Sequence, residues 1–338
     1  MVTLAASEPY SPPRGTAGLP PFRERAPWLG GDLQTLRNFL WPPAVDLAPF
    51  RTERLILPLL DGSGDHLVGT MQWPTEVRRQ PVVVIIHGLT GCEESIHVRL
   101  CAADLLRAGF PVLRLNLRGA GPSLAFCRLH YHAGRSQDLA DALAGMPARV
   151  KERGLVALGF SFGGGILLKY LGEVGGVTPL QAAVTVSTPI DLEAASRRVM
   201  ERRNRIYHWS FLRDIRRQFT AGLPEKDVRL AQEVQSLWEF DEQLTAPRNG
   251  FASAADYYRR SSAQRFLAGI AVPTLLLHAI NDPIVPVEAY RDFPWTRNRR
   301  LIPAIESKGG HVGFHNRGGG VWYHQAAELF FRRVLSLS

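Results

Sequence analysis

The sequence predicts an α/β fold with a mostly parallel central sheet, helices on both faces and a helical insertion. The continuous apolar run Val82–Ile86 is typical of a strand that is buried on both faces, as in a parallel sheet. From residue 81 onward, strand and helix patterns alternate at the spacing of βαβ units, which join parallel strands through right-handed crossovers. Residues 190–264 interrupt this alternation with mainly helical patterns. The 338 residues are enough for one such domain with an insertion.

The segment before the parallel sheet predicts a tail, an arm and a hairpin. Residues 1–25 are rich in Pro, Gly, Ser and Ala, so we expect a disordered tail, and they lack the basic start and apolar core of a signal peptide. Residues 26–43 combine tryptophans with a short helical pattern and are expected to pack on the main body. Two strands, Arg54–Leu59 and Leu67–Trp73, should form an antiparallel hairpin through a turn at residues 61–64.

The remaining elements divide the chain into a core and a cap. Before the insertion we expect helices at Glu93–Ala108, Ser136–Lys151 and Phe162–Leu171, and strands at Val112–Leu117, Leu155–Phe160 and Ala182–Ser187. After it we expect strands at Thr274–His278 and Arg300–Ile305, and helices at Val287–Asp292 and Trp322–Leu335. The buried side of the last helix should comprise Ala326, Leu329, Phe330 and Val334. Residues 26–189 and 265–338 therefore make the predicted core, and residues 190–264 the cap or lid.

A motif of the form G-x-S-x-G lies at residues 159–163, between a buried strand and a helix. In this context Ser161 is expected at a strained turn, with its hydroxyl exposed at the carboxyl edge of the sheet. The flanking glycines leave room for the strained backbone and for close packing of helix on strand. The helix N-terminus behind the serine offers positive potential and free N–H groups. The motif therefore predicts Ser161 as a nucleophile rather than a plain Gly-Ser turn.

A second loop, His87–Gly91, follows the first buried strand of the parallel set. Loops of this kind supply one of the two backbone N–H groups that stabilise an oxyanion. The expected donors are the backbone N–H groups of Leu89 and Phe162, and each such donor is typically worth about 3–4 kcal/mol in the transition state. His87 follows the wrong strand for a catalytic base, so we expect it to hold its own loop.

The acid and the base are expected after the last two strands of the sheet. Asp282 lies in the turn Asn281–Pro286, where a carboxylate could orient an imidazole. His311 lies among glycines at residues 309–313, and those glycines allow the loop to direct its ring at the serine. The order Ser, Asp, His along the chain favours a triad of Ser161, Asp282 and His311. His315 is the weaker alternative for the base, and Glu306 for the acid.

The net charge of the chain limits the classes of partner that we expect. The net charge is +9, and only four of the 40 basic residues are lysines. No basic tract carries a nucleic-acid-binding motif, so we interpret the charge as a solvated shell and expect no nucleic-acid partner. Eight arginines fall within residues 197–217 together with aromatics, which favours a solvated cap helix but leaves peripheral membrane contact open.

No cofactor or metal site is expected. Three cysteines without paired spacing argue against a disulfide framework and indicate a reducing, cytoplasmic setting. His130 and His132 share a face if extended, yet no further ligand pattern accompanies them. The segment Asn116–Gly119 could shape the substrate pocket, but a loop-holding role is the better interpretation.

The motifs together resemble the YheT-like α/β hydrolases, a group with the plant embryogenesis-associated proteins and animal abhydrolase-domain lipases. The similar stretches are Pro27–Pro42 with its Leu-Gln-Thr, His87–Gly91, Asn116–Gly119, residues 131–134, Gly159–Gly164, residues 240–242, residues 256–258, Asn281–Pro286 and Gly309–Phe314. The resemblance covers about residues 26–335 and implies the α/β-hydrolase fold, with its triad on Ser161, Asp282 and His311. This chain departs from it at Cys92, where the family often has serine, and around residues 120–122.

The expected function is hydrolysis of carboxylic esters, short- to medium-chain or acylglycerol-like, through an acyl-enzyme. The expected partner is a small-molecule ester or lipid substrate, and the oligomeric state is left open. Acyl transfer by the same triad is one alternative, and a non-catalytic binding protein on a hydrolase fold is another.

Overall fold

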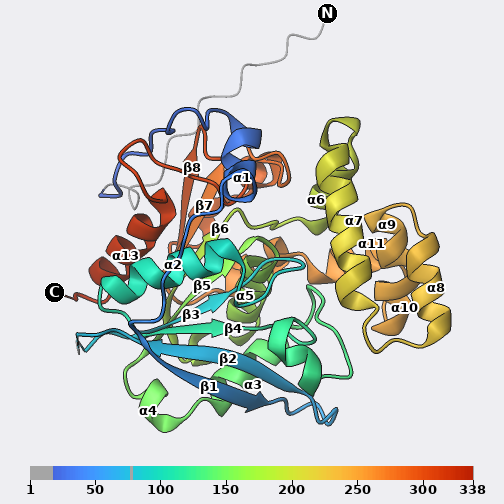
Figure 1. The fold of residues 1–338 in the computed structure, drawn as a ribbon, viewed down its shortest axis with the longest axis horizontal. Coiled ribbons are helices and arrows are strands. Elements are labelled where there is room, and N and C mark those ends of the chain that lie inside the picture. Colours follow the sequence, from blue (N-terminus) through green and yellow to red (C-terminus); the bar gives the residue numbers. More distant parts are fainter. Residues whose placement is uncertain (1–17, 77–78, 338) are drawn as a thin grey trace, which may run out of the picture.

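The structure is a computed structural model that describes residues 18–76 and 79–337. Its centre is a sheet of eight strands in the order β1-β2-β4-β3-β5-β6-β7-β8 (Figure 1). The strands are β1 (Arg51–Pro58), β2 (His66–Trp73), β3 (Val82–Ile86), β4 (Val112–Leu115), β5 (Leu155–Phe160), β6 (Leu180–Val186), β7 (Thr274–Ala279) and β8 (Leu301–Glu306). β2 pairs antiparallel with both β1 and β4. The other six strands in sheet order, β4-β3-β5-β6-β7-β8, are parallel to one another. The predicted hairpin and mostly parallel sheet are confirmed.

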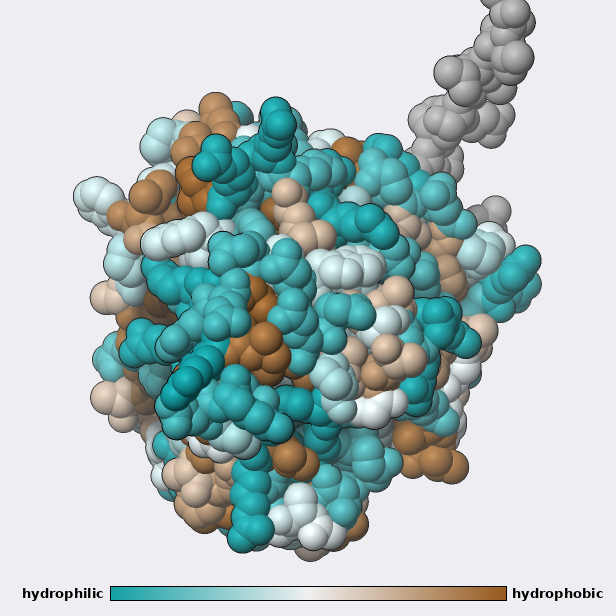
Figure 2. Space-filling model, turned by 90° about the vertical axis from the view of Figure 1, so that its right-hand side faces the viewer, coloured by the Kyte–Doolittle hydropathy of each residue, from teal (hydrophilic) through white to brown (hydrophobic). Residues whose placement is uncertain are grey.

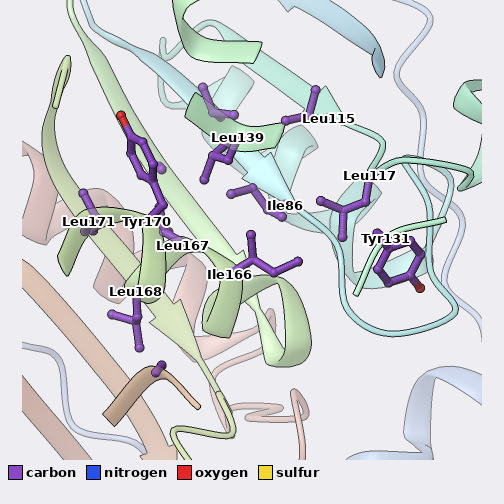
Figure 3. Packing of buried hydrophobic residues seen from close by; sticks show 14 of the residues in the cluster. Ile86, Leu115, Leu117, Tyr131, Leu139, Ile166, Leu167, Leu168, Tyr170 and Leu171 are labelled. Atoms are coloured by element: carbon purple, nitrogen blue, oxygen red, sulfur yellow. The ribbon is translucent and has the colours of Figure 1, made fainter. Parts of the chain in front are cut away.

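The two faces of the sheet bury alternate residues of each strand, as the period of two demands. On β3, Val82, Val84 and Ile86 pack in one layer with helices α3 (Ser136–Gly145) and α5 (Ser161–Val174). Val83 and Ile85 pack in the opposite layer with helices α2 (Ile96–Arg107) and α13 (Trp322–Val334). Figure 3 shows side chains of the first layer, among them Ile86 and Ile166, gathered between sheet and helix. A β-branched residue at every position of β3 therefore serves both cores.

The helices of the core are α2 (Ile96–Arg107), α3 (Ser136–Gly145), α4 (Ala148–Lys151), α5 (Ser161–Val174), α12 (Glu288–Asp292) and α13 (Trp322–Val334). The single helix predicted over residues 136–151 is two helices, because Pro147 lacks the N–H that would continue the first one. On α13, Leu329 is exposed, contrary to the prediction, while Ala326 and Phe330 are buried. The buried stripe instead continues through Ala327 and Phe331, one position further round the helix.

The segment between β6 and β7 is helical and lies beside the carboxyl ends of the strands (Figure 1). It contains α6 (Leu192–Met200), α7 (Arg205–Phe219), α8 (Glu225–Glu233), α9 (Leu237–Phe240), α10 (Ala246–Arg248) and α11 (Ala254–Ser261), with a π-helical turn at Asp241–Thr245. Figure 2 shows a mainly hydrophilic surface on this side, with small hydrophobic patches. On α7, Phe211 packs against the hydrophobic core, whereas Ile206 and Trp209 are exposed. Peripheral membrane contact through this cap stays a prediction.

The N-terminal arm is ordered over a longer stretch than expected. Helix α1 (Gly31–Leu40) confirms the short helical pattern. Residues 1–17 of the predicted disordered tail lie outside the described residues, but residues 18–25 are packed. The ring of Phe22 lies 5.5 Å from that of Phe314 and 5.8 Å from that of Trp322, whose indole N–H donates to Pro20 O at 2.7 Å. The predicted boundary at residue 25 is therefore wrong, because Pro20 and Phe22 of the arm contact Trp322, the first residue of α13.

The segment Asn116–Gly119 holds loops, as the better interpretation had it. The Arg118 side chain is fully buried and forms ion pairs with Asp61, Asp65 and Asp138 at 2.7–3.0 Å. These contacts tie the hairpin turn between β1 and β2 to the end of β4 and to α3.

In the ranges that the structure describes, no helix is both long enough and apolar enough to span a membrane.

Candidate active site

The nucleophile elbow forms where β5 passes directly into α5. Ser161 has a φ of 46°, which is rare and strained for any residue with a side chain. The glycines around it are required by close approach, since a Cβ on Gly163 would lie 2.1 Å from His87 O. A Cβ on Gly164 would likewise lie 2.0 Å from Thr188 Oγ1. Bare backbone therefore lets α5 begin against two neighbouring loops while Ser161 stands at the edge of the sheet.

The three residues predicted as a triad are brought together. His311 Nε2 lies 3.0 Å from Ser161 Oγ, and His311 Nδ1 lies 2.8 Å from Asp282 Oδ2. Because a carboxylate only accepts, Nδ1 carries the proton and Nε2 faces the serine hydroxyl with its lone pair. These residues follow β5, β7 and β8, whose carboxyl ends share one edge of the sheet. The arrangement allows the imidazole to take a proton from the serine.

The Asp282 carboxylate is buried and held by its own turn. Its Oδ1 accepts hydrogen bonds from the backbone N–H groups of Ile284 and Val285 at 2.8 and 2.9 Å. Burial alone would raise the pKa of Asp282, but the charge and hydrogen bond of His311 outweigh burial and hold that pKa below its ordinary value. The carboxylate therefore stays ionised at neutral pH, where it can stabilise an imidazolium.

His278, at the end of β7, also borders the acid and was not expected at the site. Its Nδ1 lies 4.0 Å from Asp282 Oδ2, and its ring stacks on Tyr290 with centroids 4.3 Å apart. Burial lowers the pKa of His278 to about 4, so the ring is neutral at pH 7. A neutral ring adds bulk beside Asp282 without competing with His311 as a cation.

The alternatives weighed for base and acid have other surroundings. His315 is buried, its backbone N–H donates to Gln34, and burial lowers its pKa to about 3. Within the described residues, the Glu306 carboxylate has no hydrogen bond to His311; burial raises its pKa. His87 donates from Nδ1 to Gly88 O at 2.7 Å and accepts the Leu117 N–H at Nε2, so it holds its loop.

The predicted oxyanion donors flank Ser161. A Cβ on Gly88 would lie 3.4 Å from Ser161 Cβ, so the loop that carries Leu89 lies against the nucleophile. The backbone N–H of Leu89 has no hydrogen-bond acceptor in the parts of the chain that the structure covers. Phe162 is in the first turn of α5, where backbone N–H groups have no partner within the helix. Two N–H groups thus remain available beside the serine.

Tyr131 connects this loop to the cap. Its hydroxyl accepts the Thr90 N–H at 2.7 Å and donates to Gln218 Oε1 at 3.1 Å, while Gln218 Nε2 donates to Gly91 O at 3.3 Å. Its ring meets that of Phe162 edge-on, with centroids 5.7 Å apart. Sequence reasoning gave Tyr131 no role beyond the resemblance, since the contact spans 41 residues to Thr90 and 87 to Gln218.

Replacing Tyr131 by phenylalanine is expected to lower kcat about tenfold, with a smaller effect on KM. The part-buried Thr90 N–H would lose its acceptor, at a cost of about 1 kcal/mol, and the oxyanion loop would be less firmly held. Steady-state kinetics on a chromogenic ester measures the change. Tyr170→Phe is the matched control, because Tyr170 is also buried, lies in α5 and not at the oxyanion loop, and has its hydroxyl 3.1 Å from Thr178 Oγ1. Equal kcat for both variants would contradict the expectation.

The other histidine and cap motifs stabilise the fold. His130 stacks on Phe219, and His132 Nδ1 accepts the Gly134 N–H at 3.1 Å. In the described ranges no three potential metal ligands of the His, Cys, Asp and Glu types cluster. In the cap, Tyr258 donates to Asp241 at 2.6 Å, which joins α11 to the π-helical turn. The similar stretches at residues 240–242 and 256–258 therefore meet each other.

A cavity of about 220 Å³ lies between α2 and the start of α13, away from the triad. It contains the pair His324 and Asp104, 2.7 Å apart, but no serine or cysteine lines it. It therefore offers no serine or cysteine nucleophile, and no residue of the predicted triad lines it.

Comparison with protein families agrees with this geometry. The family model described as "alpha/beta hydrolase fold" matches residues 81–317. The "Putative esterase YheT" of Escherichia coli strain K12 is 31% identical over 292 residues, which is 83% of this chain and 83% of that protein. The "Monoacylglycerol lipase" of Saccharomyces cerevisiae is 30% identical over 75% of this chain, but the match covers only 59% of that protein.

A second yeast protein and a solved structure complete the comparison. The "Medium-chain fatty acid ethyl ester synthase/esterase 2" of S. cerevisiae is 31% identical over 75% of this chain and 62% of its own length. The esterase Pf2001 of Pyrococcus furiosus superposes with a TM-score of 0.56 at 18% identity, covering 86% of this chain and 98% of that one. At that identity the likeness extends to the fold alone.

Proposed function

The chain belongs to the α/β-hydrolase family, and from this premise we propose that it is a serine hydrolase that cleaves carboxylic esters through an acyl-enzyme. The observation that carries the proposal is the contact of His311 Nε2 with Ser161 Oγ at 3.0 Å, with Asp282 behind the imidazole. The esterase and lipase names of its relatives support the same class of reaction.

In the proposed reaction His311 removes the proton from Ser161 as the serine oxygen bonds to the ester carbonyl carbon. The carbonyl oxygen becomes an oxyanion beside the N–H groups of Leu89 and Phe162. His311 then gives its proton to the leaving alcohol, which departs and leaves the acyl group on the serine. Water repeats the sequence and releases the acid. Asp282 balances the imidazolium at each stage.

Apolar side chains between the cap and the serine support an acyl group as substrate. The ring of Phe219, the last residue of α7, lies 4.9 Å from that of Tyr131 and 6.3 Å from that of Phe240. Leu89 and Phe162 pack against the same hydrophobic cluster. A short- to medium-chain or acylglycerol ester could place its hydrocarbon among these side chains. The helices over the site would then act as a lid.

Acyl transfer is the second candidate. The name of one yeast relative includes an ethyl ester synthase as well as an esterase activity. The same acyl-enzyme would pass its acyl group to an alcohol instead of water wherever the alcohol is the better-placed nucleophile. Product analysis by chromatography, with ethanol or glycerol added to the reaction, distinguishes the two activities. New ester as the main product favours transfer, and free acid favours hydrolysis.

A series of p-nitrophenyl esters from acetate to palmitate tests the proposed hydrolysis. We expect kcat/KM to pass through a maximum at short to medium chains and to fall for the longest acyl group, because the cap packs closely over Tyr131. Monoacylglycerols of matched chain length show whether a glycerol leaving group is preferred. A purified, folded protein that hydrolyses none of these esters would be evidence against the proposal.

A further inference from the structure

Helix α1 lies directly on the loops that carry the acid and the base, although it is about 250 residues away along the chain. A Cβ on Gly31 would lie 2.0 Å from Asn281 O, and one on Gly310 would lie 2.3 Å from Gly31 O. A Cβ on Gly313 would lie 2.6 Å from Gln34 O. The backbones of the arm and of both loops therefore touch without intervening side chains.

The Thr35 hydroxyl contacts the backbone of His311, the residue that carries the base. It donates to Gly31 O, one helical turn earlier, at 2.7 Å. Because its only proton is directed there, its lone pairs face outward, and one of them accepts the backbone N–H of His311 at 2.8 Å. The position of the His311 backbone is thus set by a side chain of α1.

Gln34 holds the same loop at a second point. Its side chain is fully buried, its Oε1 accepts the His315 N–H at 2.6 Å, and its Nε2 donates to His315 O at 3.3 Å and to Trp28 O at 2.6 Å. All three of these hydrogen bonds join the Gln34 amide to backbone atoms. Gln34 and Thr35 together hold both ends of residues 311–315.

The loop between these two points is strained. Val312 and Phe314 have φ values of 54° and 47°, a region that residues with side chains rarely adopt. Such a backbone persists only where its surroundings enforce it. Further contacts come from Ser187 Oγ, which accepts the Val312 N–H, and from Asn281 Oδ1, which accepts the Gly310 N–H, both at 3.0 Å.

We propose that Thr35, supported by Gln34, is a positioning residue that holds the His311 imidazole in register with Ser161 and Asp282. The inference rests on the proposed hydrolase function and deepens it, because it makes the N-terminal arm part of the active site. A misplacement of about 1 Å can cost about 10²-fold in rate, so the loss of one hydrogen bond that holds the His311 backbone is expected to matter.

The test compares Thr35→Val, which keeps the shape but removes the hydroxyl, with Thr35→Ser, which restores it. We expect Thr35→Val to lower kcat by about ten- to a hundredfold with little change in KM, and Thr35→Ser to stay within about threefold of the wild type. Thr52→Val is the matched control: the Thr52 hydroxyl also donates to a backbone carbonyl and accepts one N–H, but on the edge strand β1. Thermal unfolding is measured for each variant, and Thr35→Ala replaces Thr35→Val if the latter does not fold.

A second readout separates this inference from the proposed function. The rate at which a fluorophosphonate probe labels Ser161 reports activation of the serine by His311 without any ester substrate. Slow labelling of a folded Thr35→Val, recovered in Thr35→Ser, supports the positioning role. Labelling and kcat equal to the wild type overturn this inference alone. A wild-type protein that is neither labelled nor active on esters overturns both.

Discussion

Replacing Ser161 by alanine is expected to lower kcat by about 10⁴- to 10⁶-fold and to abolish labelling by a fluorophosphonate probe. The variant cannot form the serine–acyl bond, and the remaining oxyanion donors and the binding of substrate give only residual catalysis. Folding should be nearly unchanged, because alanine adds no atom at this crowded turn. The measurements are kcat on the preferred ester of the chain-length series and the unfolding transition in urea.

The site of labelling can be read without ambiguity. Trypsin cleaves after Arg153 and Lys169, and in the peptide of residues 154–169 the nucleophile is the one residue with a hydroxyl group. Mass spectrometry should therefore find the probe on that peptide in the wild type and nowhere in Ser161→Ala. Ester hydrolysis by Ser161→Ala at the wild-type rate would refute the nucleophile assignment. A wild type that resists every serine-directed probe would favour a non-catalytic binding protein on this fold.

Replacing Asp282 by asparagine is expected to lower kcat by about 10⁴-fold. The amide can offer the His311 Nδ1 no negative charge, and its NH₂ group favours the imidazole tautomer that has its lone pair on the wrong side. Glu306→Gln is the control, since Glu306 is the other carboxylate that the sequence allowed as the acid. It should leave kcat within about threefold of the wild type, because its carboxylate does not hold the imidazole. A large loss of kcat in Glu306→Gln with little loss in Asp282→Asn would make Glu306, and not Asp282, the acid of the triad.

Replacing Asp282 should also change how the stability of the fold depends on pH. The pKa of Asp282 in the folded protein lies below its unfolded value of about 3.9, so its ionised form stabilises the fold above that pH. This contribution is lost as the pH falls through the folded pKa. The wild type should therefore lose more unfolding free energy than Asp282→Asn between about pH 5 and about pH 3. Urea titrations across that range measure the difference, and parallel curves would argue against a lowered pKa.

Elements encoded by contiguous residues could be predicted closely from the sequence. The strand Leu155–Phe160 is observed with the predicted bounds, and the helix Trp322–Leu335 ends one residue early. Errors arose where one residue outweighed the pattern around it. Pro147 divides the expected helix over 136–151, and Leu329 on α13 lies outside the buried stripe. Hydrophobic periodicity locates a helix but does not say which neighbouring element covers each of its sides.

For the site, the serine elbow, the two loops and the order of the three residues could be found by motif alone. The contacts around these residues could not be predicted. Tyr131 lies 41 residues from Thr90 and 87 residues from Gln218, and Thr35 lies 276 residues from His311. The approach of His278 to Asp282, four residues away, depends on how the turn after β7 folds. The Leu-Gln-Thr of the arm is part of the family resemblance, but the sequence gives no role for the side chains of Gln34 and Thr35.

The residues alone were enough to predict the parallel sheet, the strained serine turn and a first choice of three residues for the edge of that sheet, with His315 and Glu306 as alternatives. These follow from local rules: β-branched runs, glycines at crowded turns and residues placed at strand ends. The folded chain was needed to see that the N-terminal arm lies on the base loop and that the cap contacts the oxyanion loop. Such contacts depend on the order of the strands in the sheet and on glycine backbones that touch because no Cβ separates them. The residues of one segment do not specify which other segment will lie against it.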